Sequence, residues 1–324
     1  MYDGFPGGLL DQLVRIAEIV LPVFGMIGVG YVCAWIGLIK QRSAEGISDY
    51  VYIIAIPLLI FRTLSEAELP EGSPWGYWVA YFTGVAVAWT IGQALSSLVF
   101  GRQTREAIIH GFTCGQSNIV MVGIPLVLAI YGTAGAVPLF LLIAVNLPLM
   151  MTAVTLLAEG TGAGLSRGSF LSLLRNLATN AILIGLAAGL TAQFLGLRLG
   201  GAPKAIVDLF AASSVPCALF AMGLSLQRYG IAGDIKISAV IAALKLLVHP
   251  FVVWLIVGYV LVLPPVWAGV AVVFAAMPCG INAYLVAGRY KTGVAAVTGA
   301  VSISTTVSIL TISLWLWVFG LGVR

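Results

Sequence analysis

The chain has 324 residues, of which 60% are hydrophobic and only 9% are charged. A typical soluble domain carries roughly 25% charged residues, so this composition excludes an ordinary soluble protein. A membrane-spanning helix needs about 20 apolar residues. The sequence contains ten such stretches, which leave no room for a soluble catalytic or regulatory domain. Spans 1 to 10 are predicted at roughly residues 14–37, 46–65, 76–100, 106–131, 135–158, 171–196, 203–227, 236–262, 266–289 and 293–320.

The location of the cations predicts an orientation. Ten of the 16 Lys and Arg residues follow odd-numbered spans, so the positive-inside rule puts these loops in the cytoplasm and both termini outside. The expected location is a plasma membrane, such as the bacterial inner membrane. The bases are scattered singly and in pairs, which does not predict a nucleic-acid-binding face. The ten cations are Lys40, Arg42, Arg102, Arg105, Arg167, Arg175, Arg228, Lys236, Arg289 and Lys291.

The four cysteines all lie within predicted spans. A disulfide framework of a secreted protein would place cysteines in loops, so these are interpreted as free thiols. No pair has the spacing of a metal site, and the sequence predicts neither a metal nor a cofactor. The cysteines are Cys33, Cys114, Cys217 and Cys279.

Span 2 begins near Asp49, and span 7 begins near Asp208. Two interpretations remain open for these carboxylates. Each could stabilise the first turn of its helix through its negative charge, or Asp49 could form a proton or Na⁺ site. No carboxylate lies at the centre of any span, so a coupling ion would have to rely on Asp49 or on neutral oxygens.

Span 4 is predicted to be a broken helix. A helix in lipid must satisfy its backbone hydrogen bonds internally, yet this span contains a polar stretch and a proline, which lacks an amide donor and clashes with the preceding turn. Broken helices are tolerated at membrane depth where they line a cavity, and many transporters build their substrate sites from them. The residues concerned are Gly115, Gln116, Ser117, Asn118, Gly123 and Pro125.

Span 8 carries Lys245 and His249, four residues apart and hence on one face of a helix. An ionisable residue inside a membrane span is by default a functional hypothesis. We expect Lys245, close to the middle of the span, to attract an anion or to couple conformational change. His249 either titrates near neutral pH or packs with a hydrogen bond ahead of Pro250.

The two halves of the chain resemble each other. Ile47-Ser-Asp49 and Pro57-Leu-Leu-Ile-Phe61 match Ile206-Val-Asp208 and Pro216-Cys-Ala-Leu-Phe220 at a constant offset of 159 residues (208 − 49). The same offset places span 4 on span 9, which is also interrupted. A repeat with an odd number of spans must be inverted in the membrane. The prediction is an all-α membrane protein of ten helices in two inverted five-helix repeats, 1–160 and 161–324, with spans 4 and 9 broken.

These motifs resemble the auxin efflux carrier family. The resemblance covers all ten spans and rests on Ile56–Phe61, Asn118–Leu126 with Tyr131-Gly132, Phe220–Leu224, and Pro278–Tyr284 with Tyr290. It implies a homodimeric scaffold of spans 1, 2, 6 and 7. It also implies a transport domain of spans 3–5 and 8–10, which moves as an elevator and whose two broken helices cross. The pattern around Asn282 is similar to bacterial members, so auxin itself is not implied.

Asn118 and Asn282 lie at the two predicted breaks, and each offers a donor amide and an acceptor oxygen. The positive N-terminal ends of half-helices suit a carboxylate, so the pair predicts a site for a small organic anion. Interhelical hydrogen bonding is the structural alternative. Gln116 and Ser117 are further candidates, and the resemblance implies that Asn146 forms a support site beside the substrate. The residues expected to shape the breaks are Gly123, Pro125, Pro278 and Gly280.

The predicted function is carriage of small carboxylates without a coupling ion. Moving one charge across a membrane is worth about 2.3 kcal/mol per 100 mV, so an interior-negative cell expels anions spontaneously, which favours efflux or uniport. Three alternatives differ in kind. A sodium- or proton-coupled symporter of the bile-acid-transporter type would show ion-dependent uptake. An enzyme would need a nucleophile paired with a base, and the sequence contains no motif for such a pair. A sensor would bind without flux.

Overall fold

The computed structural model describes residues 8–67, 74–162, 167–230 and 234–319. Within these ranges the ordered elements are helices, and the sole extended pairing is one isolated bridge between Ser117 and Cys279. The first half contains α1 (Leu9–Trp35), α2 (Gln41–Tyr50), η1 (Val51–Ala55), α3 (Ile56–Glu66), α4 (Trp75–Leu98), α5 (Thr104–Gly115), η2 (Ile119–Gly123), α6 (Ile124–Tyr131), η3 (Gly132–Gly135) and α7 (Ala136–Gly160). The second contains α8 (Arg167–Ala178), α9 (Ala181–Phe194), α10 (Gly201–Tyr229), α11 (Ile235–Ala243), η4 (Leu244–Val248), α12 (His249–Leu255), η5 (Ile256–Val260), α13 (Pro265–Ala276), α14 (Ile281–Tyr290) and α15 (Val294–Phe319).

Seven helical segments of the described chain are long and apolar enough to cross a membrane, and the bent pair α8–α9 makes an eighth if it counts as one span. This is the signature of an integral membrane protein. The number is below the ten predicted spans because breaks divide spans 4, 6 and 9 into shorter helices. In addition, the second part of span 4 continues into span 5 as one segment, Ile119–Gly160.

Three of the prolines inside continuous helical segments follow a π-helical turn. Pro57 follows η1, Pro125 follows η2 and Pro250 follows η4, each with one residue between. In each turn a backbone amide donates to the carbonyl five residues earlier, as Ile124 does to Ile119. A proline cannot donate and clashes with the carbonyl four residues before it. The wider turn accommodates that defect without ending the helix.

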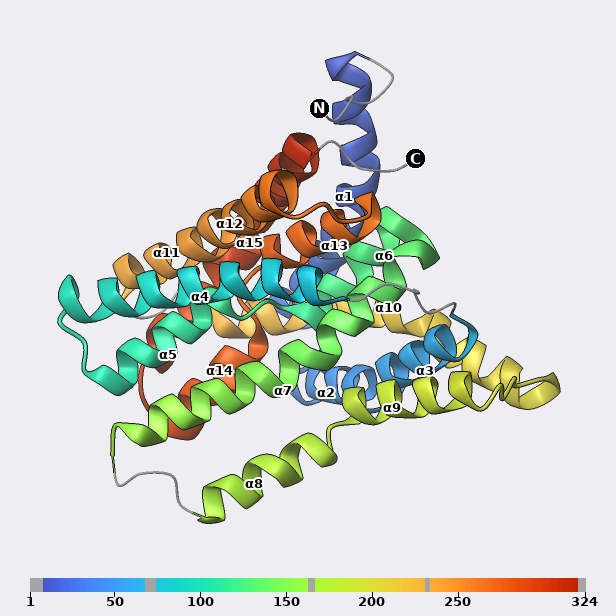
Figure 1. Cartoon of the computed structure of the whole chain (residues 1–324), viewed down its shortest axis with the longest axis horizontal. Helices are drawn as coiled ribbons and strands as arrows, with labels where there is room; N and C mark the ends of the chain where they lie inside the picture. Colours follow the sequence, from blue (N-terminus) through green and yellow to red (C-terminus); the bar gives the residue numbers. More distant parts are fainter. Residues whose placement is uncertain (1–7, 68–73, 163–166, 231–233, 320–324) are drawn as a thin grey trace.

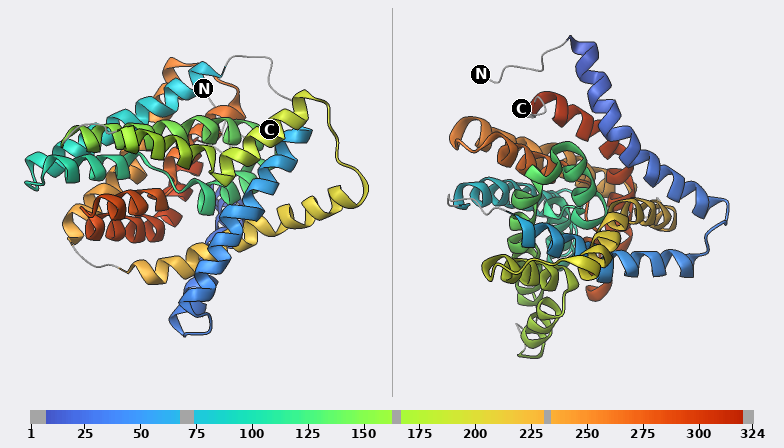
Figure 2. Two further views of the ribbon diagram at one scale, coloured as in Figure 1. Left: turned by 90° about the horizontal axis from the view of Figure 1, so that it is seen from below. Right: turned by 90° about the vertical axis from the view of Figure 1, so that its right-hand side faces the viewer.

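One group of helices consists of α1, α2, α3, α9 and α10. α1 packs along α10, and α3 packs against both α9 and α10; Figure 1 shows α3, α9 and α10 side by side, and Figure 2 shows α1 along one edge of the molecule. Glycines allow two equivalent close crossings. A Cβ at Gly30 would lie 2.2 Å from the carbonyl oxygen of Phe220, and one at Gly189 would lie 3.1 Å from that of Phe61.

These crossings obey the repeat offset, because Gly189 and Phe220 follow Gly30 and Phe61 by 159 residues (189 − 30 and 220 − 61). A further contact joins two residues that are equivalent to each other under the same offset. Ser214 Oγ donates a hydrogen bond of 2.7 Å to the carbonyl oxygen of Ala55, 159 residues away.

The second group of helices consists of α4, α5, α7 and α11–α15. α4 packs along α5 and α12, while α15 packs against α11, α13 and α14. The largest fully buried aromatic side chains belong to this group: Tyr77 and Tyr81 from α4, Phe112 from α5, Phe140 from α7 and Phe274 from α13. Tyr81 contacts both broken spans, since its ring packs 5.1 Å from that of Phe274 and its hydroxyl oxygen lies 3.3 Å from Ser117 Oγ.

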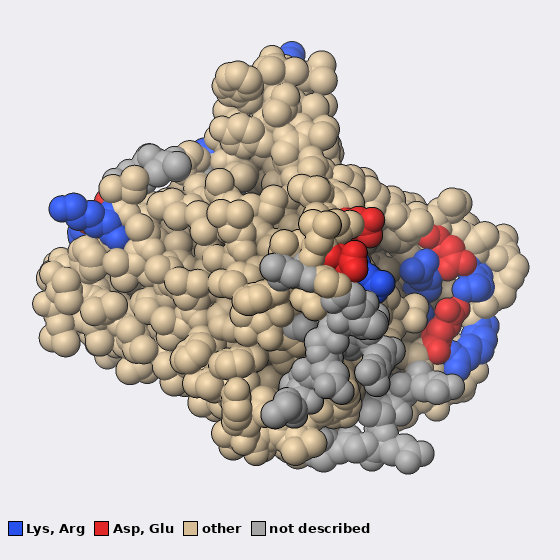
Figure 3. Space-filling model, turned by 90° about the horizontal axis from the view of Figure 1, so that it is seen from above, with Lys and Arg blue, Asp and Glu red and all other residues tan. Residues whose placement is uncertain are grey.

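Charged side chains gather at two sides of the molecule. Figure 3 shows a broad uncharged surface between charged groups toward its left and right sides, as expected for a belt in contact with lipid. Every ion pair among the described residues joins groups that the sequence assigns to one side of the membrane. On the predicted cytoplasmic side Arg102 pairs with Asp234 and Arg228 with Glu45; on the other side Lys204 pairs with Glu66.

Candidate functional site

The two breaks meet and hydrogen-bond to each other. The stretch between α5 and η2 and the stretch between α13 and α14 run antiparallel. The Asn118 amide donates to the Pro278 carbonyl at 2.8 Å, and the Gly280 amide donates to the Gln116 carbonyl at 2.8 Å. Backbone groups freed by the breaks thereby find partners, which a buried segment in lipid requires. We call this pairing the crossover.

The crossover follows an offset of 162 residues rather than 159 (279 − 117, the bridged pair). Under this offset its two hydrogen bonds exchange with each other, since Asn118 maps onto Gly280 and Gln116 onto Pro278. At Tyr131 and Tyr290, the ends of the helices that follow, the offset is again 159 (290 − 131). The first copy therefore holds three more residues between the crossover and this point.

Glycine is required at one position of the crossover. A Cβ at Gly280 would lie 2.6 Å from the carbonyl oxygen of Ser117, a backbone atom that cannot move independently. Gly123 and Pro125 lie in η2 and α6, beyond the break that they were expected to shape. Pro125 is absorbed by the π turn before it, while the Gly123 amide donates to the Asn118 carbonyl at 3.0 Å.

A cavity of about 270 Å³ lies against the crossover. Its apolar lining comes from isoleucine, leucine and valine side chains of η2, α7, α9 and α14. None of the described residues that line it is Lys or Arg. The negative charge of a ligand would therefore be met by amides, hydroxyls and backbone dipoles rather than by an ion pair. The polar lining residues are Asp49, Tyr52, Ser117, Asn118, Asn180 and Asn282.

The two asparagines predicted as ligands both line this cavity. Asn118 is only 2% exposed, and its Nδ2 lies 3.2 Å from the sulfur of Met222. Thioether sulfur is a weak acceptor, so a carboxylate oxygen would be the stronger partner for this amide. Asn282 is half-buried in the first turn of α14, where amides at the helix start add a favourable potential for an anion.

Gln116, Ser117 and Asn146 differ from the asparagines in their surroundings. The hydroxyl of Ser117 lines the cavity but donates to the Phe274 carbonyl at 2.8 Å and lies 3.3 Å from Tyr81 Oη, so it braces the crossover. Gln116 and Asn146 are fully buried, and neither side-chain amide has a partner among the described residues. Neither lines the cavity, although the neighbours of Asn146 on α7, Ile143 and Leu147, do.

Lys245 and His249 do not line the cavity either. Lys245 is fully buried, and its Nζ donates to the Ala275 carbonyl at 2.5 Å and lies 3.3 Å from His249 Nδ1. Ala275 is in the last turn of α13, where a cation is favoured by the helix dipole. The His249 ring packs 5.1 Å from that of Tyr81, measured between centroids. Lys245 therefore binds the C-terminal end of α13, the half-helix that leads into the crossover.

Asp49 connects the crossover cavity with a wider one. The wider cavity, of about 800 Å³, shares Asp49, Tyr52, Ile281 and Leu285 with it and extends to the side that carries Lys40. This is the side that the sequence predicts to be cytoplasmic. The candidate site therefore opens toward that side.

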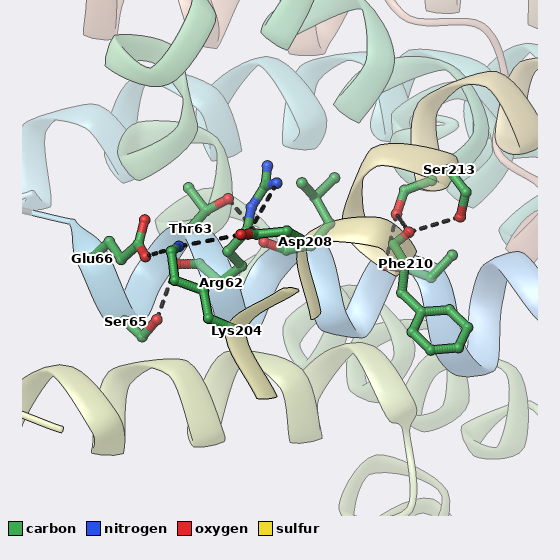
Figure 4. A network of polar contacts seen from close by, with 11 residues as sticks. Arg62, Thr63, Ser65, Glu66, Lys204, Asp208, Phe210 and Ser213 are labelled. Carbon is green, nitrogen blue, oxygen red and sulfur yellow. Dashed lines mark hydrogen bonds and ion pairs between the residues drawn. The ribbon is translucent and has the colours of Figure 1, made fainter. Parts of the chain in front are cut away.

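A third cavity, of about 630 Å³, lies on the opposite side, and none of its described lining residues lines the crossover cavity. Figure 4 shows the polar network at its edge, where Asp208 lies 3.6 Å from Arg62 and 3.4 Å from Lys204, and Lys204 lies 2.6 Å from Glu66. Solvent screens such exposed pairs, so they contribute little to stability. Asp49, the repeat counterpart of Asp208, forms no ion pair with the described residues.

Asn180 is a cavity residue that the sequence analysis missed. Span 6 was predicted as one helix, but α8 and α9 meet at a bend of 54° just before Ala181. Asn180 caps α9, and its side chain reaches the crossover cavity. The sequence held a signal, because Asn is a preferred N-cap residue and an apolar run follows it.

Comparison with known proteins identifies the class. A family described as "Membrane transport protein" matches residues 15–316, and the chain belongs to this family, the auxin efflux carrier family. The chain is 23% identical over 312 residues to a Rhizobium meliloti protein named "Putative malonate transporter", covering 96% of this chain and 98% of that one. It is 25% identical to an uncharacterized transporter of Methanothermobacter thermautotrophicus, over 92% and 96% of the two chains. The protein is thus a transport protein rather than an enzyme.

A more distant likeness covers only part of the chain. A mouse protein named "Lysosomal cholesterol signaling protein" is 25% identical over 122 residues, which is 37% of this chain and 14% of that one.

Proposed function

We propose that this protein is a secondary transporter of small carboxylates. The observation that carries the proposal is the crossover cavity, which Asn118 and Asn282 both line and whose described lining residues include no Lys or Arg. Drug-sized ligands occupy roughly 300–1,000 Å³, so a cavity of about 270 Å³ suits a smaller molecule. The relative named for malonate transport supports the same class of substrate.

The architecture that we propose is two inverted five-helix repeats, residues 1–160 and 161–324, in ten spans. The paired crossings at Gly30 and Gly189, the bond between Ser214 and Ala55, and the exchangeable bonds of the crossover support a two-fold relation between the halves. Spans 1, 2, 6 and 7 form the scaffold and the dimer interface. Spans 3–5 and 8–10 carry the site between the two faces of a bacterial inner membrane, with both termini outside.

Transport without a coupling ion is the simpler mechanism. The membrane potential supplies about 2.3 kcal/mol per charge and 100 mV, which drives a monoanion outward through a uniporter. Coupled symport is the second candidate, favoured by a specific observation. Asp49 places a titratable carboxylate on the cavity wall, and Gln116 and Asn146 hold buried amide oxygens without partners that could face a cation.

The test is charge movement on a solid-supported membrane with reconstituted protein. Mono- and dicarboxylates are added with and without Na⁺ and a pH gradient. Uncoupled carriage predicts currents that need the anion alone and that disappear in Asn118→Ala and Asn282→Ala. Currents that require Na⁺ or a proton gradient would establish symport and would make Asp49→Asn the next variant. The absence of current with every carboxylate would reject the substrate class.

A further inference from the structure

We propose that Asn180 is the third amide of the site and binds the distal end of the substrate, so that the preferred substrate is a short dicarboxylate. This inference rests on the proposed function and adds to it a residue and a narrower class of substrate. It starts from the position of Asn180 at the junction of α8 and α9, in the wall of the crossover cavity.

The hydrogen bonds of Asn180 leave one group free. Its backbone amide donates to the Leu177 carbonyl at 3.2 Å, and its carbonyl accepts from the Ile184 amide at 2.9 Å. Its side-chain Oδ1 accepts from the amides of Ile182 at 3.0 Å and Leu183 at 3.2 Å. Only Nδ2 has no partner among the described residues.

An asparagine in this state can only donate. The N-cap bonds occupy Oδ1 and fix the orientation of the amide plane, so that the two N–H groups of Nδ2 remain available on a side chain that lines the cavity. A carboxylate accepts such bonds and does not donate them. The N-cap therefore orients this donor for an anionic oxygen before the substrate arrives.

The donors lie in two different parts of the fold. Asn118 lies in the crossover and Asn282 in the first turn of α14 beside it, whereas Asn180 caps α9, which packs on α3 in the other group of helices. Apolar side chains such as Ile143 and Leu147 complete the wall of this cavity of about 270 Å³. A ligand that bridges the two sets of donors needs acceptor oxygens at both ends and a short apolar middle. Asp49 lines the same cavity, but an ionised carboxylate only accepts hydrogen bonds, so it cannot donate to the substrate in place of Asn180.

A matched pair of ligands isolates this contact. Malonate and propanoate both have three carbons, and only malonate carries a carboxylate at its second end. Asn180→Ser keeps an N-cap oxygen and removes the amide donor. We expect this variant to bind malonate about tenfold more weakly, since a bond to a charged group is lost, and to bind propanoate as the unmodified protein does. Asn118→Ala should weaken both ligands.

The measurement is isothermal titration of the purified full chain with each ligand, alongside its melting temperature. Asn180→Ala removes both cap and donor and reports what loss of the cap does to stability. If Asn180→Ser keeps the preference for malonate, or weakens both ligands equally with a lower melting temperature, Asn180 is only a cap and the inference is wrong. If the unmodified protein binds neither ligand and carries no carboxylate current, the proposed function itself fails.

Discussion

Replacing Gly280 by alanine should disrupt the crossover. The new methyl group would lie 2.6 Å from the carbonyl oxygen and 3.0 Å from the carbonyl carbon of Ser117, both backbone atoms of the opposite break. The two stretches must separate, which strains or breaks the bonds from Asn118 to Pro278 and from Gly280 to Gln116. Each such bond is worth about 1 kcal/mol, and buried backbone groups left unpaired cost about 1–3 kcal/mol more. We expect a loss of about 3 kcal/mol of stability.

Binding should suffer as well, because Asn118 lies on one of the stretches that separate and Asn282 lies in the first turn of α14, directly after the other. The assay compares the melting temperature and the dissociation constant for malonate of Gly280→Ala with those of Gly288→Ala. Gly288 lies in α14, the helix that Gly280 precedes, and a Cβ there would meet nothing within 4 Å. If Gly280→Ala melts and binds like Gly288→Ala, the crossover is not the close contact described here and the reasoning is refuted.

Three further predictions concern single residues. Asp49→Asn should tighten dianion binding by up to roughly fivefold, because it removes a negative charge from the cavity wall and the interaction of a solvent-exposed charge is worth about 0–1 kcal/mol; unchanged affinity in calorimetry would mean that this carboxylate lies too far from the bound anion to repel it. Lys245→Met should lower stability by about 1–3 kcal/mol, because it removes the hydrogen bond to the Ala275 carbonyl. The dissociation constant for malonate should change less than twofold, because Lys245 does not line the cavity. Lost binding in a fully stable variant would contradict this. Gly223→Ala should destabilise the protein in a thermal melt, because its Cβ would lie 2.0 Å from the carbonyl oxygen of Ile27, whereas Gly25→Ala should not.

Much of the candidate site was predictable because polar side chains are conspicuous among the apolar residues of a membrane helix. Asn118 and Asn282 stand out in apolar runs, and the structure places both on one cavity. The roles of their neighbours were less accessible. Lys245 was conspicuous as a buried charge, but its partner is a backbone carbonyl that no residue pattern encodes. Asn146 was identified by resemblance, and its expected support role stays a prediction.

The predictions from sequence that the structure does not match failed for physical reasons. Pro125 was expected to break span 4, but a proline can be absorbed by a π turn, and the break occurs earlier at 116–118. Asn180 lies in a run apolar enough to look like one helix, and the 54° bend depends on packing between elements that are far apart in sequence. The prediction of a constant repeat offset also failed at the crossover, where the offset is 162 rather than 159, because the first copy has three more residues between the crossover and Tyr131. Sequence indicates where a helix is unstable, and tertiary contacts decide where it ends.

The π turns before Pro57, Pro125 and Pro250 have a consequence for helical-wheel analysis of this chain. Each turn accommodates one residue more than a regular helix, and each residue advances the helix by about 100°. Residues on opposite sides of η1, such as Asp49 and Phe61, therefore cannot be placed on one wheel with a single phase. A cysteine-accessibility scan along this segment should show two periodic patterns, displaced from each other by about one residue.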